Sequence, residues 1–169
     1  MAKIEVAACT RLLNNEGVLG YSGHVSKRLP DGDTLLIQAF DASRNDLSPE
    51  DLYIIDLDGN VLEGDPNARP VNELEIHAEI LRARPDINAV LHWHPEIATL
   101  FTMVEGADLV PMKNHAYRWS SGIPTHLESW HIDTKERGQA MVKTMGEHNA
   151  VLLRAHGAVI GAESIPALM

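Results

Sequence analysis

Nine histidines are the most chemically informative feature of this chain of 169 residues. Two of them, His92 and His94, end an apolar run that is typical of a strand buried on both faces. Side chains two apart in a strand point to the same face, so both imidazoles project together and Trp93 points away. A rigid strand end is suited to holding two neutral nitrogen ligands of a metal. The same pattern also fits two histidines that hydrogen-bond to nearby loops.

A third histidine, His156, follows a second apolar run at 150–153. If the strands of 89–94 and 150–156 are neighbours, three imidazoles converge, and three histidines with an open fourth position form a catalytic metal site. Gly157 would let backbone or a ligand approach closely. Taken alone, His156 fits a polar residue at the end of a strand better than it fits a metal ligand.

A carboxylate candidate lies at the start of a predicted helix. Asn72 is expected to cap a helix that runs to about Arg84, with Glu75 at the capping-box position. Glu73 then occupies the first helical position, where free backbone N–H groups favour an anion, and this alone can explain it. His77 lies one turn further on the same face. We interpret His77 as a core histidine or as a residue that supports the site, with a role as a fourth ligand less favoured.

Composition narrows the class of protein. With 44% hydrophobic and 22% charged residues, the chain is typical of one globular domain. The net charge of −10 without a basic block argues against nucleic acid as a partner, and no apolar run approaches the ~20 residues of a membrane helix. A single cysteine, Cys9, without cationic neighbours fits a cytoplasmic protein and does not predict a reactive thiolate. Neither a nucleophile elbow nor a nucleotide-binding loop is found.

Helical and strand patterns alternate and include hairpins, which predicts an α/β sandwich with a mixed or mostly antiparallel sheet. The first helix, at 3–16, is expected to bury one face carrying Ile4, Ala7, Ala8, Leu12 and Leu13. A second clear helix is expected at 135–145. Strands are predicted at 24–28, 34–38, 52–56, 89–91 and 150–153.

Four separated motifs resemble the class II aldolase/adducin superfamily, in the right order and over most of the chain. They are Gly-Tyr-Ser-Gly-His-Val-Ser at 20–26, Leu-Ser-Pro-Glu-Asp-Leu at 47–52 with Asp-Leu-Asp-Gly at 56–59, Glu73 and His77 with the stretch 84–94, and Ala-His-Gly at 155–157.

The resemblance implies a divalent metal held by His92, His94 and His156, with Zn²⁺ first and Mn, Fe or Co as other choices. It implies Glu73 as the catalytic acid/base, or as a metal ligand when substrate is absent. It also implies a three-layer α/β/α fold with a central, mainly antiparallel sheet, and a homotetramer with sites between subunits. Residues 1–169 would form a single domain of this type that lacks the C-terminal helices usual in the family.

The chain departs from the prototype, fuculose-phosphate aldolase, in the phosphate-binding loops. Phe40 and Asp41 would place bulk and negative charge where the phosphate sits, whereas Gly23 and His24 keep the form of the first loop. The resemblance makes Gly23, His24 and His115 candidates for substrate binding. The match is closer to the branch that includes decarboxylases of hydroxylated aromatic or pyridine dicarboxylates. The tyrosine that the prototype's neighbouring subunit donates has no clear match, and His115 lies nearest.

The sequence therefore predicts a metal-dependent carbon–carbon lyase that decarboxylates a hydroxylated aromatic or heteroaromatic (di)carboxylic acid through a stabilised enolate. Burial would raise the pKa of Glu73 so that it can donate a proton. Arg69, Arg118 and Arg154 are candidates to bind a second carboxylate of this small-molecule substrate. One alternative is an aldolase, dehydratase or epimerase that acts on a sugar or hydroxy-keto acid. The other is a non-catalytic adducin-like binding module, against which the three histidines argue.

Overall fold

The computed structural model describes residues 1–67 and 69–169. Its helices are α1 (Ala2–Asn15), α2 (Leu74–Ala83), α3 (Glu96–Phe101) and α4 (Lys135–Met145), with short 3-10 segments η1 (Pro49–Asp51), η2 (Asn114–Trp119) and η3 (Pro166–Leu168). The strands are β1 (His24–Arg28), β2 (Thr34–Gln38), β3 (Leu52–Asp56), β4 (Val61–Glu63), β5 (Ala89–Trp93), β6 (Thr125–His126), β7 (Ala150–Leu153) and β8 (Gly157–Ala162).

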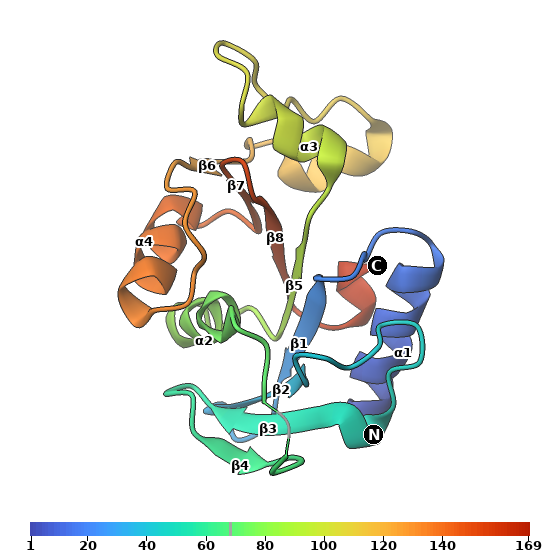
Figure 1. The fold of residues 1–169 in the computed structure, drawn as a ribbon. Helices are drawn as coiled ribbons and strands as arrows, with labels where there is room; N and C mark the ends of the chain where they lie inside the picture. Colours follow the sequence, from blue (N-terminus) through green and yellow to red (C-terminus); the bar gives the residue numbers. More distant parts are fainter. Residues whose placement is uncertain (68) are drawn as a thin grey trace.

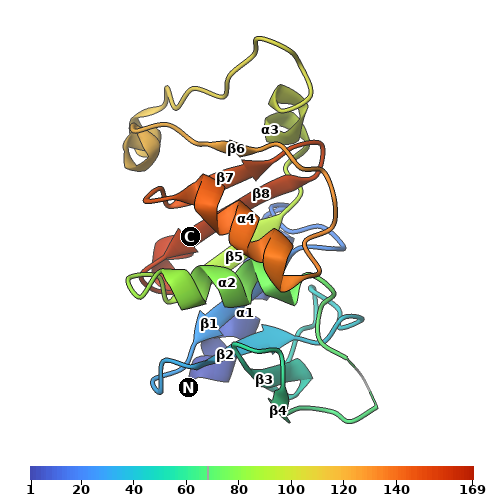
Figure 2. The ribbon, with the colours of Figure 1, turned by 90° about the vertical axis from the view of Figure 1, so that its left-hand side faces the viewer.

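These described strands form one eight-stranded sheet in the order β4-β3-β2-β1-β5-β8-β7-β6. Each neighbouring pair is antiparallel except β6 and β7. Helices α2 and α4 cover one face of the sheet and α1 covers the other (Figures 1 and 2). The predicted three-layer α/β/α architecture with a mainly antiparallel sheet is confirmed.

Each face of the sheet has its own apolar core. Ile76 of α2 and Met141 of α4 pack on one face, where Val90 of β5 also points. Val6 of α1 packs on the other face with Leu91 of β5. Adjacent residues of β5 thus enter opposite cores, as expected for a strand buried on both sides. Full burial of a side chain of this size contributes about 1.5–3 kcal/mol, so the central strand is held firmly from both sides.

The buried face of α1 differs from the predicted one. Ile4 and Leu12 are 57% and 46% exposed, while Val6, Cys9 and Leu13 are buried. The spacing of these three residues follows a helical period, but the small side chains of the helix left its rotation open to tertiary packing. Burial raises the pKa of Cys9 to about 11, which agrees with the absence of a reactive thiolate.

The start of α2 also differs from the prediction. The helix begins at Leu74, and Glu73 rather than Asn72 occupies the cap position, without a side-chain cap hydrogen bond. The Asn72 side chain instead accepts a hydrogen bond from Arg69 at 2.6 Å. The capping box at Glu75 is therefore not formed, and the carboxylate of Glu73 is free to turn toward the sheet.

The strand that carries His92 does not pair with the strand that precedes His156. β5 pairs with β8, and β7 lies one strand further out. His156 sits in the tight turn between β7 and β8, so it approaches the end of β5 from that turn. The supposed adjacency was wrong, although the convergence that it was meant to explain occurs.

Among the described helices, none has the length and apolarity needed to cross a membrane.

Arg28 joins β1 to the C-terminal end of α2. Its guanidinium donates hydrogen bonds to the carbonyls of Leu81, Arg84 and Ile87. We expect Arg28→Met to lower the free energy of unfolding by about 2 kcal/mol, because it removes charged donors from carbonyls at a helix end. Urea denaturation at neutral pH measures this change.

Arg137→Met is the matched control. Arg137 pairs with Asp133 at 2.5 Å on the surface, where an ion pair contributes about 0–1 kcal/mol. Equal losses for both variants would show that Arg28 does not anchor α2.

Candidate functional site

Four side chains from three parts of the fold meet at the end of β5. Ligand atoms of Glu73, His92, His94 and His156 all lie within 4.8 Å of one another. The Nε2 atoms of His92 and His94 are 3.1 Å apart, and Glu73 lies 3.4 Å from the Nε2 atoms of both His92 and His156. Tetrahedral zinc with Zn–N distances of 2.0–2.1 Å would separate its ligands by roughly 3.3 Å. The cluster therefore has the dimensions of a divalent-metal site.

Hydrogen bonds at the far side of the rings support this interpretation. His92 Nδ1 donates to the carbonyl of Ala158 at 3.0 Å, which leaves the Nε2 lone pair directed at the cluster. His94 Nδ1 contacts the hydroxyl of Ser22 at 2.8 Å in the same way. Burial, together with the neighbouring imidazoles, lowers the pKa of His94 to about 4. Neutral imidazoles with converging lone pairs fit a cation at their centre.

Backbone geometry next to His156 brings the rings together. A Cβ atom at Gly157 would lie 2.5 Å from the carbonyl oxygen of Trp93 and 2.7 Å from the ring of His94. The predicted close approach at Gly157 is therefore confirmed as an approach of backbone. Ala155 has φ of 52°, a left-handed conformation that costs a residue with a side chain about 1–2 kcal/mol. The turn thus accepts strain in the residue before His156.

Glu73 is a carboxylate in this arrangement. Burial by itself raises its pKa, but the imidazoles of His156 and His92 beside the carboxylate outweigh burial and hold the pKa well below its ordinary value. The backbone N–H of Ile132 also donates to Glu73, at 3.2 Å. The expected rise of this pKa was wrong, because the imidazoles that the fold brings to the carboxylate lower it. An ionised Glu73 is suited to bind a cation or to accept a proton.

A chain of buried hydrogen bonds lies behind the cluster. Ser26 Oγ is 2.6 Å from Nδ1 of His77, and His77 Nε2 is 2.7 Å from Nδ1 of His24. The Ser26 hydroxyl has no other partner among the described residues, so we assign it as the donor to His77. In this assignment His77 donates to His24, whose ring lines the pocket. His77 is a supporting core residue, as predicted.

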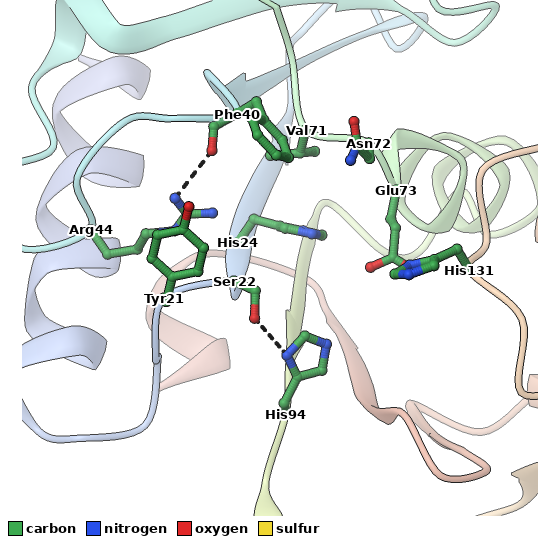
Figure 3. Close-up of a pocket in the computed structure, with 10 residues that line it drawn as sticks. All are labelled: Tyr21, Ser22, His24, Phe40, Arg44, Val71, Asn72, Glu73, His94 and His131. Atoms are coloured by element: carbon green, nitrogen blue, oxygen red, sulfur yellow. Dashed lines mark hydrogen bonds and ion pairs between the residues drawn. The ribbon is translucent and has the colours of Figure 1, made fainter.

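A pocket of about 260 Å³ opens beside the cluster. Figure 3 shows Glu73, His94 and His131 on one side of it and Arg44 with Tyr21 on the other, with His24 between them. The volume is below the roughly 300–1,000 Å³ of sites for drug-sized ligands, so the pocket suits a compact molecule. The residues that line it are Tyr21, Ser22, His24, Phe40, Arg44, Val71, Asn72, Glu73, His94 and His131.

The structure brings only some of the predicted substrate-binding residues to this pocket. His24 lines it, and the carbonyl of Gly23 lies directly behind it as an acceptor for Arg44. Arg69 is exposed and stacks on the outer side of Phe40, with 4.0 Å between its guanidinium and the ring. His115 and Arg154 are exposed and do not line it.

Two further departures concern charged residues. Asp41 lines a different hollow, so its carboxylate does not add negative charge beside the cluster. Arg118 pairs with Glu163 at 2.6 Å away from the pocket.

Sequence reasoning missed two residues of the pocket. Arg44 comes from the segment after β2, and His131 comes from the loop before α4, with its Nδ1 3.4 Å from Glu73. Neither residue has an informative spacing to the other site residues in the sequence. Arg44 does lie in the same loop as Phe40 and Asp41, and this position is the one signal in the sequence that points to it.

Comparison with known proteins agrees with this geometry. The model of the "Class II Aldolase and Adducin N-terminal domain" family matches residues 4–169. A 3,4-dihydroxyphthalate decarboxylase of Arthrobacter keyseri is 33% identical, over 97% of this chain and 70% of its own length. An L-fuculose phosphate aldolase of Methanocaldococcus jannaschii is 27% identical, over 96% of this chain and 84% of its own. The solved structure of an L-fuculose 1-phosphate aldolase superposes with a TM-score of 0.86 at 24% identity, covering 96% and 76% of the two chains.

The fold is that of the class II aldolases, and the family match with its decarboxylase and aldolase relatives defines the chain as a lyase. The chain belongs to the class II aldolase and adducin N-terminal domain family, over nearly all of its length. The predicted superfamily and the predicted enzyme class are thereby confirmed.

The close approach at Gly157 generates a prediction. We expect Gly157→Ala to weaken Zn²⁺ binding at least about tenfold, because the added methyl group displaces the ring of His94 or the backbone of Trp93. Calorimetric titration of the metal-free protein with Zn²⁺ measures the affinity. Gly20→Ala is the control, since a methyl group there meets no atom within 4 Å. Unchanged affinity in Gly157→Ala would contradict the argument.

The buried histidines generate a pH prediction. Burial, followed by the charge of His92, lowers the pKa of His77 to about 3, and burial holds that of His24 well below its ordinary value. The unfolded chain binds protons at these groups below about pH 6.5, and the folded chain does not. The free energy of unfolding of the metal-free protein should therefore fall as the pH falls from 6.5 to 5, by about 1 kcal/mol per unit for each group.

Urea denaturation across this range tests the prediction in wild type and in His77→Gln. The variant should show a slope smaller by about 1 kcal/mol per pH unit, because one of the two groups is removed. Above pH 7 the two slopes should coincide. Identical slopes below pH 6.5 would show that His77 takes up a proton in the folded protein.

Proposed function

We propose that this chain decarboxylates a hydroxylated aromatic or heteroaromatic carboxylic acid. The observation that carries the proposal is the shared pocket: the Glu/His₃ cluster opens onto walls formed by Tyr21, Phe40 and Val71. Aromatic and apolar walls of this kind pack against a planar ring. Two relatives named as 3,4-dihydroxyphthalate decarboxylases, 33% and 30% identical to this chain, support the same substrate class.

His92, His94 and His156 would hold the cofactor, a divalent ion for which zinc is the first choice and Mn, Fe or Co are alternatives. When bound, it would supply Lewis-acid stabilisation of the negative charge that develops on a substrate oxygen as the carbon–carbon bond breaks. The hydrogen bonds from the rings to Ala158 and Ser22 keep the donor atoms in place.

Glu73 would move the proton. It starts as a carboxylate, so it can accept the proton of the substrate's ring hydroxyl. Glu73 would then deliver this proton to the ring carbon that carries the carboxylate, and loss of CO₂ from that carbon leaves the electron pair as enolate charge on the ring oxygen. The same group thus acts first as base and then as acid, and this order is consistent with its low pKa. The N–H of Ile132 holds one carboxylate oxygen in position.

Aldol cleavage of a sugar phosphate is the second candidate. It is supported by the L-fuculose phosphate aldolase relative, and it would use the same cluster and the same proton carrier. The side chain of Phe40 on the pocket wall disfavours it, because an apolar ring offers no hydrogen bond to a phosphate. A small-molecule carboxylate as substrate is therefore our first choice.

The assembly into a homotetramer and the cytoplasmic location stay predictions. So do the absence of nucleic-acid and membrane partners and the single domain over 1–169.

Two variants separate metal binding from proton transfer. His94→Ala should lose bound metal and turnover together, because it removes a nitrogen ligand. Glu73→Gln should keep the metal on the three histidines and lower turnover roughly 10²–10⁴-fold, because the amide cannot carry the proton. Metal analysis and release of CO₂ from a panel of hydroxylated aromatic acids are measured on the same samples.

His148→Ala is the control, since this histidine contacts Ser121 outside the cluster. Release of an aldehyde from sugar phosphates, without CO₂ from any aromatic acid, would favour the aldolase instead. An unchanged rate in Glu73→Gln would refute the proton-transfer role.

A further inference from the structure

Arg44 is a buried arginine that the reaction proposed above does not use. It is only 8% exposed, and it lines the same pocket as Glu73 and His94. Figure 3 places its guanidinium beside Tyr21, on the side of the pocket that faces away from Glu73. A ligand that reaches the metal cluster from this pocket would therefore have Arg44 near its other end.

Neutral oxygens satisfy most of the guanidinium. Its Nε donates to the carbonyl of Gly23 at 2.9 Å, and its Nη1 donates to the carbonyls of Ala42 and Phe40 at 2.8 and 3.3 Å. When the Gln38 amide is oriented with its oxygen toward Arg44, that oxygen accepts from Nη2 at 3.2 Å. Nη2 carries two hydrogens, and one of them has no acceptor among the described residues.

The positive charge of Arg44 has no carboxylate partner. None of the ion pairs in the described part of the chain includes it, whereas Arg84 pairs with Asp86 and Arg118 with Glu163. A net charge of −10 means that acidic residues are not scarce. A buried cation without a counter-ion is costly, and burial accordingly lowers the pKa of Arg44. A bound anion would remove this cost.

A second polar side chain belongs to the same space. With the Ser26 hydroxyl as the first donor, the chain through His77 leaves one N–H on the His24 ring, and this ring lines the pocket. The pocket thus offers the free N–H of Arg44 at one end, while the His24 ring lies between Arg44 and Glu73. Phe40 and Val71 add apolar wall without hydrogen bonds, which suits an aromatic acid better than a phosphate.

We propose that Arg44 binds a carboxylate that the reaction leaves in place, the second acid group of an aromatic diacid. The identity of the diacid rests on the proposed function, but the anion site can be tested without turnover. Arg44 would set specificity by requiring a second negative group at a fixed distance from the cluster.

Calorimetry on the zinc-loaded full chain tests the proposal. The probes are the three benzenedicarboxylate isomers, benzoate and inorganic phosphate. Wild type should bind its best diacid at least about tenfold more tightly than benzoate, because only the diacid reaches Arg44. Arg44→Met should lose this preference, with benzoate binding unchanged. Arg44→Lys should be intermediate, since it keeps the charge but not the planar fork.

Arg11→Met is the matched control for a purely structural effect. Arg11 donates to the carbonyl of Leu47, in the segment that carries Arg44, from outside the pocket. This variant should keep the diacid preference. Zinc content and thermal midpoint are measured for every variant, and if Arg44→Met does not fold, Arg44→Lys decides by the same comparison.

Three results would overturn the proposal. These are an equal loss of diacid and benzoate binding in the Arg44 variants, an unchanged diacid preference, and Arg44-dependent binding of phosphate that is tighter than that of every diacid. Failure of the proposed function can be distinguished from failure of the anion site. If the diacid preference depends on Arg44 but no aromatic acid releases CO₂, the anion site stands and the decarboxylase proposal falls. If CO₂ is released and Arg44→Met keeps the diacid preference, the decarboxylase proposal stands and the anion site falls.

Discussion

Four electron-pair donors held within 4.8 Å of one another are the constraint around which this structure is arranged. Lone pairs and a carboxylate at this spacing repel each other unless a cation or protons lie between them. The fold nevertheless fixes them, because the outer nitrogens of His92 and His94 are engaged by Ala158 and Ser22. Gly157 supplies the space in which the backbone of the β7–β8 turn meets β5. The stability of the surrounding sheet therefore maintains a geometry in which a bound cation would relieve the repulsion.

The two ends of the pocket beside the cluster carry groups of opposite charge. One side carries the carboxylate of Glu73 and the candidate metal ligands, and the other carries the guanidinium of Arg44. Between them lies the ring of His24, whose position depends on the buried chain through His77 to Ser26. Low polarisability around such groups strengthens their interactions with a ligand. The arrangement orients an anionic, planar molecule with one end at the cluster.

Much of the fold was predictable because the relevant signals are local. Strands β1, β2 and β3 and helix α4 have the predicted bounds, since turn residues and an N-cap at Thr134 mark their ends. Features that depend on packing were predicted less well. The buried face of α1 was misassigned, because the small residues around it permit more than one rotation. The cap of α2 was misassigned, because Glu73 is drawn toward the histidines and Asn72 toward Arg69.

The sequence by itself determined the types of the cluster residues and the shared face of His92 and His94, because a strand repeats every two residues. Only the tertiary structure decided that His156 reaches them from the β7–β8 turn, since pairing of β5 with β8 is a long-range contact. It also decided which arginine faces the pocket. Arg44 is placed there by carbonyls of Gly23, Phe40 and Ala42. Such contacts depend on loop paths in space, for which residue spacing carries no signal.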